Sequence, residues 1–240
     1  FTGGSDTGVM KIVSQLFRDA RSAVPLIGVF AWGTTLGRED LVGQRGGTAF
    51  HDPKVPPCKD GAGLHPDHTH FLLVDTGTEG SAAWASERPF RAALERELAA
   101  LSSTVIQVVI QGGLGVLENV LSAAKAGVPI IVLADTGGAA TAIYEFLRAG
   151  IDKVEEMFKQ YADLLEAIKA VNDEAASRGS QLVYMWLLLK SKESLVQTMR
   201  SAVGNSMHVT IDALAGGDGG PSATFTEKNH VGLALLSAVN

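Results

Sequence analysis

Four short apolar runs, each ending in a glycine-rich turn, constrain the fold more than any other feature of this sequence. The runs are residues 26–32 (LIGVFAW), 71–74 (FLLV), 104–110 (TVIQVVI) and 129–133 (PIIVL). Beyond their turns, the last two lead into helical patterns at residues 114–126 and 139–149. Continuous apolar strands that alternate with helices are typical of a parallel sheet with helices on both faces. We therefore predict an α/β fold with a parallel sheet flanked by helices.

The pattern changes twice, and these changes suggest the domain organisation. Residues 34–66 contain four prolines and many glycines without periodicity, which predicts a long irregular insertion. After Gly150 the predicted elements are helices at residues 151–177, 182–189, 195–203 and 227–239 and a possible edge strand at 208–214. We therefore predict a ligand-binding domain over residues 1–150 and a helical extension over residues 151–240. Phe1 is predicted to end a truncated strand, so we expect the chain to be a fragment of a longer protein.

Composition limits what kind of protein this can be. With 20 Lys and Arg against 26 Asp and Glu, the net charge is −6, and no stretch is rich in basic residues, so we expect no nucleic-acid partner. The longest purely apolar run, residues 182–189, has eight residues, whereas a membrane-spanning helix needs about 20. We therefore expect that this fragment does not itself span a membrane. The single cysteine, Cys58, cannot form an internal disulfide, which suits a reducing compartment.

Three glycine-rich turns are candidates for binding phosphate. Glycine lets backbone N–H groups approach an anion closely, and the helix N-terminus that follows adds about half a positive charge. One such turn is equally explained as a tight connection without a ligand, but one nucleotide-like ligand across all three would explain them together. Such turns lie at the carboxyl ends of strands, where open α/β sheets bind ligands. The candidate residues are Thr2, Gly3, Gly4, Ser5, Asp6, Thr7 and Gly8, then Gln111, Gly112 and Gly113, and then Asp135, Thr136, Gly137 and Gly138.

Four further side chains could complete such a site, and each also has a simpler explanation. Glu118, one turn into a predicted helix, could point at the ligand or only favour the positive end of that helix. Asp75, at a strand end, could orient a ribose or cap the next turn. Trp84 and Arg91, seven residues apart, could offer a stacking face and a phosphate partner, or be an ordinary surface aromatic and a helix-surface arginine.

The histidines between residues 65 and 70, with Cys58 and His51, resemble a metal cluster at first sight. Their spacing matches no zinc motif closely, because a Cys2His2 site needs a second cysteine. We predict instead the polar start of a strand, where alternation would put His68 and His70 on the same side. We predict no metal site, and we predict no catalytic residues because no Ser/His/Asp triad or nucleophile elbow is recognisable.

Several of these segments, in this order, resemble the SLOG superfamily of Rossmann-like nucleotide-binding domains. The likeness is more specific to the N-terminal melastatin homology region of melastatin-type transient receptor potential (TRPM) cation channels. It is carried by residues 2–11 (TGGSDTGVMK), 27–34 (IGVFAWGT), 68–78 (HTHFLLVDTGT), the pair Gly112-Gly113 and residues 134–140. It covers about the first 150 residues and extends more weakly to residues 208–214 and 233–239. The resemblance implies a Rossmann-like (SLOG) sheet followed by a mainly helical part.

The resemblance also implies a function: a regulatory domain on the cytoplasmic side of a membrane, in a channel whose neighbouring subunits form a homotetramer. It implies no required cofactor but a ligand such as ADP-ribose or a related nucleotide, whose binding contributes to gating and subunit assembly. It adds to the predicted site the residues Met10, Ala31, Trp32 and Gly33. The family's ADP-ribose-gated members have an aromatic residue and an arginine that align with Trp84 and Arg91, and a further arginine that falls at Gly138. One phosphate partner is therefore missing here.

A second function class remains open. Residues 112–118 (GGLGVLE) resemble the GGxGTxxE pattern of LOG-type phosphoribohydrolases, SLOG enzymes in which a glutamate and a nearby arginine cleave the bond between base and ribose. Here Val116 replaces the threonine, one residue instead of two separates that position from Glu118, and no arginine stands near the motif in the sequence. We therefore predict that this fragment is not an enzyme, with a LOG-like nucleotide hydrolase as the alternative.

Overall fold

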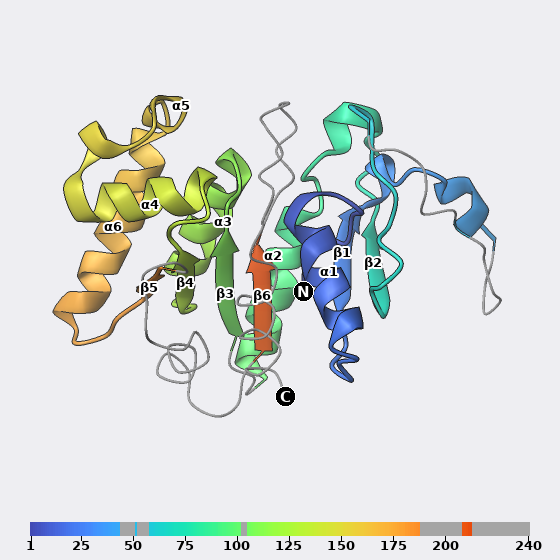
Figure 1. Ribbon diagram of the computed structural model, residues 1–240, viewed down its shortest axis with the longest axis horizontal. Helices are drawn as coiled ribbons and strands as arrows, with labels where there is room; N and C mark the ends of the chain where they lie inside the picture. Colours follow the sequence, from blue (N-terminus) through green and yellow to red (C-terminus); the bar gives the residue numbers. More distant parts are fainter. Residues whose placement is uncertain (44–50, 52–57, 102–104, 188–207, 213–240) are drawn as a thin grey trace. The chain divides into compact units, whose positions relative to one another are not determined.

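Figure 1 shows the computed structural model, which describes residues 1–43, 51, 58–101, 105–187 and 208–212 of the 240-residue chain. The chain divides into two compact units, Phe1–Arg91 and Ala92–Asn240. Helix α2 (Arg88–Ala100) contains the boundary between them. None of the helices in these described ranges combines the length and the apolar character that crossing a membrane requires.

The first unit contains a two-stranded parallel sheet and one long helix. Its elements are α1 (Gly8–Asp19), β1 (Ile27–Ala31), β2 (His70–Val74) and three 3-10 turns, η1 (Trp32–Thr34), η2 (Arg38–Leu41) and η3 (Gly80–Ala83). Strands β1 and β2 pair in parallel, and Thr2 adds a parallel bridge to Gly28 of β1. Helix α1 forms because apolar residues recur at helical spacing, with Val9 and Val13 buried on one side.

The described part of the predicted insertion contributes to the core of the first unit. Turn η2 lies in it, as do isolated bridges from Thr35 to Ala62 and from Cys58 to Gly61. Ala62 and Leu64 are buried against Phe30 of β1. Irregular backbone therefore covers part of this small sheet.

The second unit contains four parallel strands in the order β5-β4-β3-β6. Its elements are β3 (Val105–Ile110), α3 (Leu114–Lys125), β4 (Ile130–Leu133), α4 (Gly138–Ala149), η4 (Ile151–Lys153), α5 (Glu156–Lys159), α6 (Ala162–Ser177), β5 (Val183–Trp186) and β6 (His208–Asp212). Every residue of the central strands β3 and β4 is buried, as their continuous apolar runs predict. The predicted edge strand at residues 208–214 is confirmed as β6, which pairs with β3 at one edge of the sheet.

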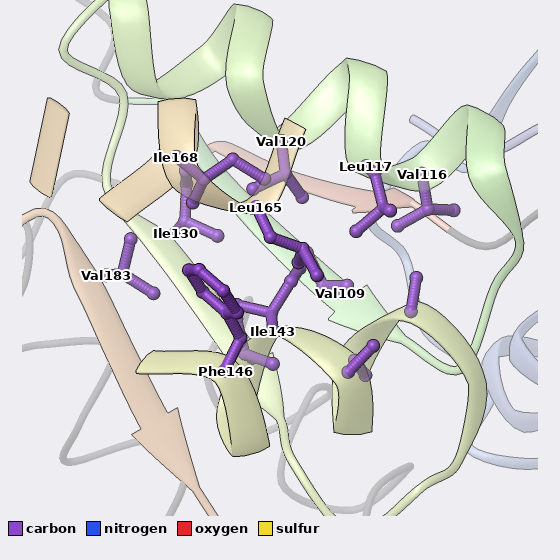
Figure 2. Packing of buried hydrophobic residues seen from close by; sticks show 14 of the residues in the cluster. Val109, Val116, Leu117, Val120, Ile130, Ile143, Phe146, Leu165, Ile168 and Val183 are labelled. Atoms are coloured by element: carbon purple, nitrogen blue, oxygen red, sulfur yellow. The ribbon is translucent and has the colours of Figure 1, made fainter. Parts of the chain in front are cut away.

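Helices α3, α4 and α6 share one apolar core with this sheet, as Figure 2 shows. Val120 of α3, Ile143 of α4 and Leu165 of α6 pack together with Val109 of β3 and Ile130 of β4, and all five side chains are buried. Burying an aliphatic side chain of this size stabilises a fold by about 1.5–3 kcal/mol. Residues on both sides of position 150 therefore contribute to the same core.

The predicted α/β fold with parallel strands flanked by helices is confirmed, but two predicted helices differ from the structure. Residues 183–186 form strand β5, which pairs with β4, because a run that is apolar on all sides gives no period to separate helix from strand. Residues 151–177 form η4, α5 and α6 instead of one helix, and Val154 and Phe158 are buried in the core from the short turns. The predicted helices at 195–203 and 227–239 lie outside the described residues.

Candidate functional site

The turn formed by residues 2–8, here called the N-terminal turn, is fixed in place by Thr2. Thr2 is fully buried, its N–H donates to the carbonyl of Ile27 at 3.0 Å, and its carbonyl accepts the N–H of Val29 at 2.9 Å. Its hydroxyl oxygen accepts the N–H of Gly4 at 3.0 Å and lies 2.6 Å from Nε2 of His68. Backbone and side-chain bonds therefore hold the start of this turn against β1.

The polar side chains of the N-terminal turn bond to each other and to helix α1. Ser5 Oγ lies 2.8 Å from Thr7 Oγ1, and the Asp6 carboxylate pairs with Lys11 Nζ at 3.1 Å. His65 Nε2 lies 3.5 Å from the same Asp6 oxygen. Burial lowers the pKa of His65, while the nearby carboxylates act to raise it.

Helix α1 begins at an open end of this turn. Its first residue, Gly8, is exposed, and the N-cap residue Thr7 makes no side-chain cap bond. Met10 is buried in the first turn, with its side chain against Gly3. The helix N-terminus therefore suits an anion, while the Lys11 ammonium beside it is already paired with the Asp6 carboxylate.

The loops that follow β1 and β2 are packed against each other at Gly33. A Cβ atom at this position would overlap the carbonyl oxygen of Thr78, so only glycine fits. Arg38 donates to the Gly33 carbonyl at 2.9 Å and to the Glu79 carboxylate at 2.8 Å. The predicted site residue Gly33 therefore serves close packing between two loops, and Arg38, which the sequence did not single out, positions both.

Three other predicted residues of this unit lie at strand ends. Ala31 ends β1 and is buried, while Trp32 begins η1 and is half-buried. Asp75 follows β2, is exposed, and accepts the N–H of Gly77 at 2.9 Å. Two roles were considered for Asp75, orienting a ribose and capping the next turn, and this bond is the one expected of a turn cap.

Trp84 and Arg91 are not ordinary surface residues. Trp84 is half-buried, its Nε1–H donates to the carbonyl of Lys59 at 2.7 Å, and its ring meets that of Phe30 edge to face, with 5.8 Å between the centroids. Arg91, on helix α2, is only 8% exposed. The indole is held in one orientation, as a stacking platform requires, and the arginine comes from a helix and not from a mobile loop.

In the second unit, Thr136 joins the loop after β3 to the loop after β4. Its hydroxyl accepts the N–H of Gln111 at 2.8 Å and donates to the carbonyl of Leu133 at 2.7 Å. Thr136 is buried, and Gln111 has a φ of +56°. The structure therefore brings together two of the three predicted turns.

The first N–H groups of helix α4 donate to backbone carbonyls of the protein itself and are therefore not free for a ligand. The N–H groups of Ala139 and Ala140 donate to the carbonyls of Gly112 at 2.8 Å and Gln111 at 3.1 Å. A Cβ atom at Gly138, where φ is +56°, would overlap the Gly112 carbonyl oxygen. Position 138 therefore has no room for a side chain, and the N–H groups of the next two residues are already bonded.

The N-terminus of helix α3 is different. It follows the N-cap Gly113, which has no side chain to bond the first N–H groups, and the N–H of Val116 folds back onto the Gly113 carbonyl at 3.0 Å. Within the described ranges, no acceptor bonds the N–H groups of Leu114 and Gly115. Of the two helix starts that follow β3 and β4, that of α3 therefore suits an anion better.

The remaining predicted residues have separate positions. Glu118 is exposed on α3, and Asp135 is half-buried after β4. Gly137 donates its N–H to Thr141 Oγ1 at 2.9 Å, and Thr141 donates to the carbonyl of Ala134 at 2.7 Å. Thr141 was not among the predicted site residues, although a threonine four residues after a glycine N-cap can signal such a bond.

The prediction that His68 and His70 lie on the same side of a strand is wrong. His68 is buried and His70 is exposed, because β2 begins only at His70 and alternation does not extend back to His68. Burial is the largest cause that lowers the pKa of His68, to about 4. Among the residues that the structure describes, no group of three or more His, Cys, Asp or Glu side chains could hold a metal ion.

Comparison with known proteins gives the family. The family described as "SLOG in TRPM" matches residues 1–187. Transient receptor potential cation channel subfamily M member 2 of Mus musculus is 29% identical over 207 residues, which cover 72% of this chain and 13% of that protein. Subfamily M member-like 2 of Nematostella vectensis is 30% identical over 161 residues, covering 59% of this chain and 10% of that protein. Subfamily M member 1 of Mus musculus is 27% identical over 248 aligned positions, covering 98% of this chain and 15% of that protein.

The chain therefore spans between 10% and 15% of the length of these relatives. Its match to the family extends over both units and includes the N-terminal turn and the loops after β3 and β4. The chain belongs to the family of SLOG domains found in TRPM channels.

Proposed function

We propose that this chain is a cytosolic regulatory domain of a TRPM-like cation channel that binds a nucleotide derivative, with ADP-ribose as the first candidate. Binding would contribute to gating and to assembly with neighbouring subunits of a homotetramer. Family membership supports the channel setting, since the relatives named above are described as cation channels. Because the chain spans only a small part of those proteins, it would act as one module of a longer chain on the cytoplasmic side of the membrane.

The observation that carries the ligand proposal is the start of helix α3. The unbonded N–H groups of Leu114 and Gly115 lie where α3 begins, at the carboxyl end of the buried strand β3. Such N–H groups with a helix dipole behind them favour a phosphate oxygen, and this end of a parallel sheet is where ligands bind. The loop after β4 is bonded to the loop after β3 through Thr136 and Gln111, which holds the backbone before α3 in place. Little conformational entropy is therefore lost in this backbone when a ligand binds.

The first unit also contains groups that suit an anion and a base. The open N-terminus of α1 suits an anionic group, and the fixed indole of Trp84 suits an adenine ring. Position 138 offers no cation, so a phosphate bound in the second unit would depend on the N–H groups of Leu114 and Gly115. A phosphate bound in the first unit would depend on the start of α1 and on Arg91. Within the first unit, the start of α1 and the Trp84 indole together match a ligand that combines a base with phosphate.

Calorimetric titration of the 240-residue chain with ADP-ribose tests the proposal. We expect Arg91→Ala to weaken binding by about 1.5–3 kcal/mol, the contribution of a charge-assisted hydrogen bond. Arg96→Ala is the matched control, because Arg96 lies on the same helix and is exposed. Arg91→Lys, checked for folding by its melting temperature, separates loss of charge from loss of packing. Equal affinity in all four proteins would remove Arg91 from the site, and no binding of any adenine nucleotide would leave the domain a structural role.

The alternative reaction, hydrolysis of a nucleotide to free base, is tested separately. The glycine-rich start of α3 with the exposed Glu118 is the feature that keeps this alternative in view. We expect no free adenine when the chain is incubated with adenosine monophosphate. Release of adenine that Glu118→Gln abolishes would show that the domain is an enzyme.

A further inference from the structure

A buried chain of hydrogen bonds links the N-terminal turn to helix α1 through His68. Nε2 of His68 lies 2.6 Å from Thr2 Oγ1, and its Nδ1 lies 3.2 Å from Ser14 Oγ. Thr2 and Ser14 are fully buried, and His68 is 7% exposed. The imidazole therefore connects the segment before β2 to the turn on one side and to the helix on the other.

The partners of each atom determine where the protons lie. The Ser14 hydroxyl donates to the carbonyl of Met10 at 2.7 Å, so its oxygen can only accept from His68. The carbonyl of His65, 3.3 Å from His68 Nδ1, is also only an acceptor. Nδ1 therefore carries the proton, and in the neutral ring Nε2 is an acceptor.

The same reasoning fixes the direction of the bonds at Thr2. Because Nε2 is an acceptor, the Thr2 hydroxyl donates to it, which leaves a lone pair of Oγ1 to accept the N–H of Gly4 at 3.0 Å. The bonds therefore run from Gly4 to Thr2 to His68, and from His68 to Ser14 and on to Met10. Every donor in this buried chain has an acceptor.

We propose that neutral His68, in the tautomer with the proton on Nδ1, is the positioning residue that holds the N-terminal turn, and that protonation of Nε2 releases the turn. A proton on Nε2 would point at Thr2 Oγ1, which already accepts from Gly4. The Thr2 hydroxyl proton would then lose its acceptor in a place that water does not reach, which is unfavourable. The effect on ligand affinity rests on the proposed nucleotide site.

The surroundings of His68 favour the neutral ring. Its ring lies 5.2 Å from that of Phe71 and 6.0 Å from that of His65, measured between centroids. Burial lowers its pKa most, the His65 carbonyl acts to raise it, and positive charge on His65 lowers it further. The charged groups on the neighbouring elements act on the pKa of His65: Asp6 and Asp67 raise it, and Lys11 and Arg18 lower it.

The tautomer can be observed directly in the 240-residue chain. We expect ¹H–¹⁵N correlation spectra of the labelled imidazole near neutral pH to show His68 protonated at Nδ1 and bare at Nε2, with the exposed His70 as the internal reference. A spectrum with the proton on Nε2 of His68 would overturn the proposal, and this measurement needs no variant.

Hydrogen exchange at Gly4 tests the positioning role. We expect His68→Leu to speed exchange of the Gly4 amide by about tenfold, the effect of losing one hydrogen bond. His68→Gln, which can place an amide oxygen near the Nε2 position, should restore part of the protection, and His70→Gln should change nothing. Exchange at Gly4 that is the same in all of these proteins would contradict the proposal.

Ligand titration adds the functional consequence. If the unmodified chain binds ADP-ribose, affinity should fall in His68→Leu and recover in part in His68→Gln, and unchanged affinity in both would contradict a positioning role in binding. If the unmodified chain does not bind, the proposed function fails, and the tautomer and the exchange at Gly4 then decide for or against the positioning role.

Discussion

A side chain at position 138 would collide with the carbonyl oxygen of Gly112, because the first turn of α4 lies directly against the loop after β3. The N–H of Ala139 donates to that same carbonyl at 2.8 Å. The contact explains why position 138 is occupied by glycine. An arginine cannot be added there without moving the loop after β3.

Serine at position 138 tests this contact. We expect Gly138→Ser to lower the free energy of unfolding by about 2–4 kcal/mol, because it adds both a collision and strain at positive φ. Gly113→Ser is the matched control, since a Cβ atom at Gly113 meets open space and serine is a good N-cap residue. Urea denaturation of both proteins measures the difference, and equal stability would show that the two loops are not in contact as described.

Removal of the Thr136 hydroxyl should loosen the same pair of loops. We expect Thr136→Val to cost about 1–2 kcal/mol of unfolding free energy, because the N–H of Gln111 loses its acceptor. Thr76→Val is the control, since Thr76 is exposed and should change stability by less than about 0.5 kcal/mol. If thermal denaturation gives the same change for both variants, the buried bond contributes nothing.

Stability should fall as the pH falls below neutrality. The unfolded His68 takes up a proton near pH 6.5, whereas the folded residue does so only near pH 4, so the unfolded state binds more protons between these values. The free energy of unfolding should therefore decrease from about pH 6.5 to about pH 4, by up to about 3 kcal/mol from this residue. His65, whose pKa is also lowered, adds a change of the same sign.

The contribution of His68 can be isolated by difference. Denaturation of the unmodified chain and of His68→Gln at several pH values cancels the titration of carboxylates that both proteins share. We expect a smaller pH slope in His68→Gln and an unchanged slope in His70→Gln. A slope that is the same in all three proteins, or that rises toward acid pH, would contradict the assignment.

Helix α6 should be as important to the second unit as the strands. We expect Leu165→Ala to cost about 2–5 kcal/mol, because this buried side chain packs against α3 and α4 and leaves a cavity when it is shortened. Leu101→Ala, at a leucine that is 73% exposed, should change stability by less than about 0.5 kcal/mol. A small effect at Leu165 would mean that residues 162–177 do not belong to this core.

The sequence predicts the parts of this fold that have a local signal. The run at residues 104–110 and the turn at Gly112 lie next to each other in the chain, so β3 and its loop could be recognised together. Residues 182–189 carry no such signal, because an apolar run without polar positions fits a buried helix and a buried strand equally well. Their pairing with β4 decides for the strand, and that is a tertiary contact.

The hydrogen bonds of the candidate site also depend on tertiary contacts that have no local signal in the sequence. Glycine-rich turns predict where backbone N–H groups can meet a ligand, but not which of those groups the protein uses itself. The bond from Gln111 to Thr136 joins residues 25 apart, and that from Thr2 to His68 joins residues 66 apart. Only the folded chain shows that the N–H groups of Ala139 and Ala140 are occupied, while no acceptor among the described residues bonds that of Leu114.

Titration of the ¹⁵N-labelled chain with ADP-ribose, followed amide by amide in NMR spectra, tests the nucleotide-binding claim most directly. We expect saturable shifts at residues 2–8 and at Gly113, Leu114 and Gly115, and smaller shifts at Ala139 and Ala140, whose N–H groups are already bonded. Shifts confined to other parts of the chain, or none at saturating ADP-ribose, would contradict it.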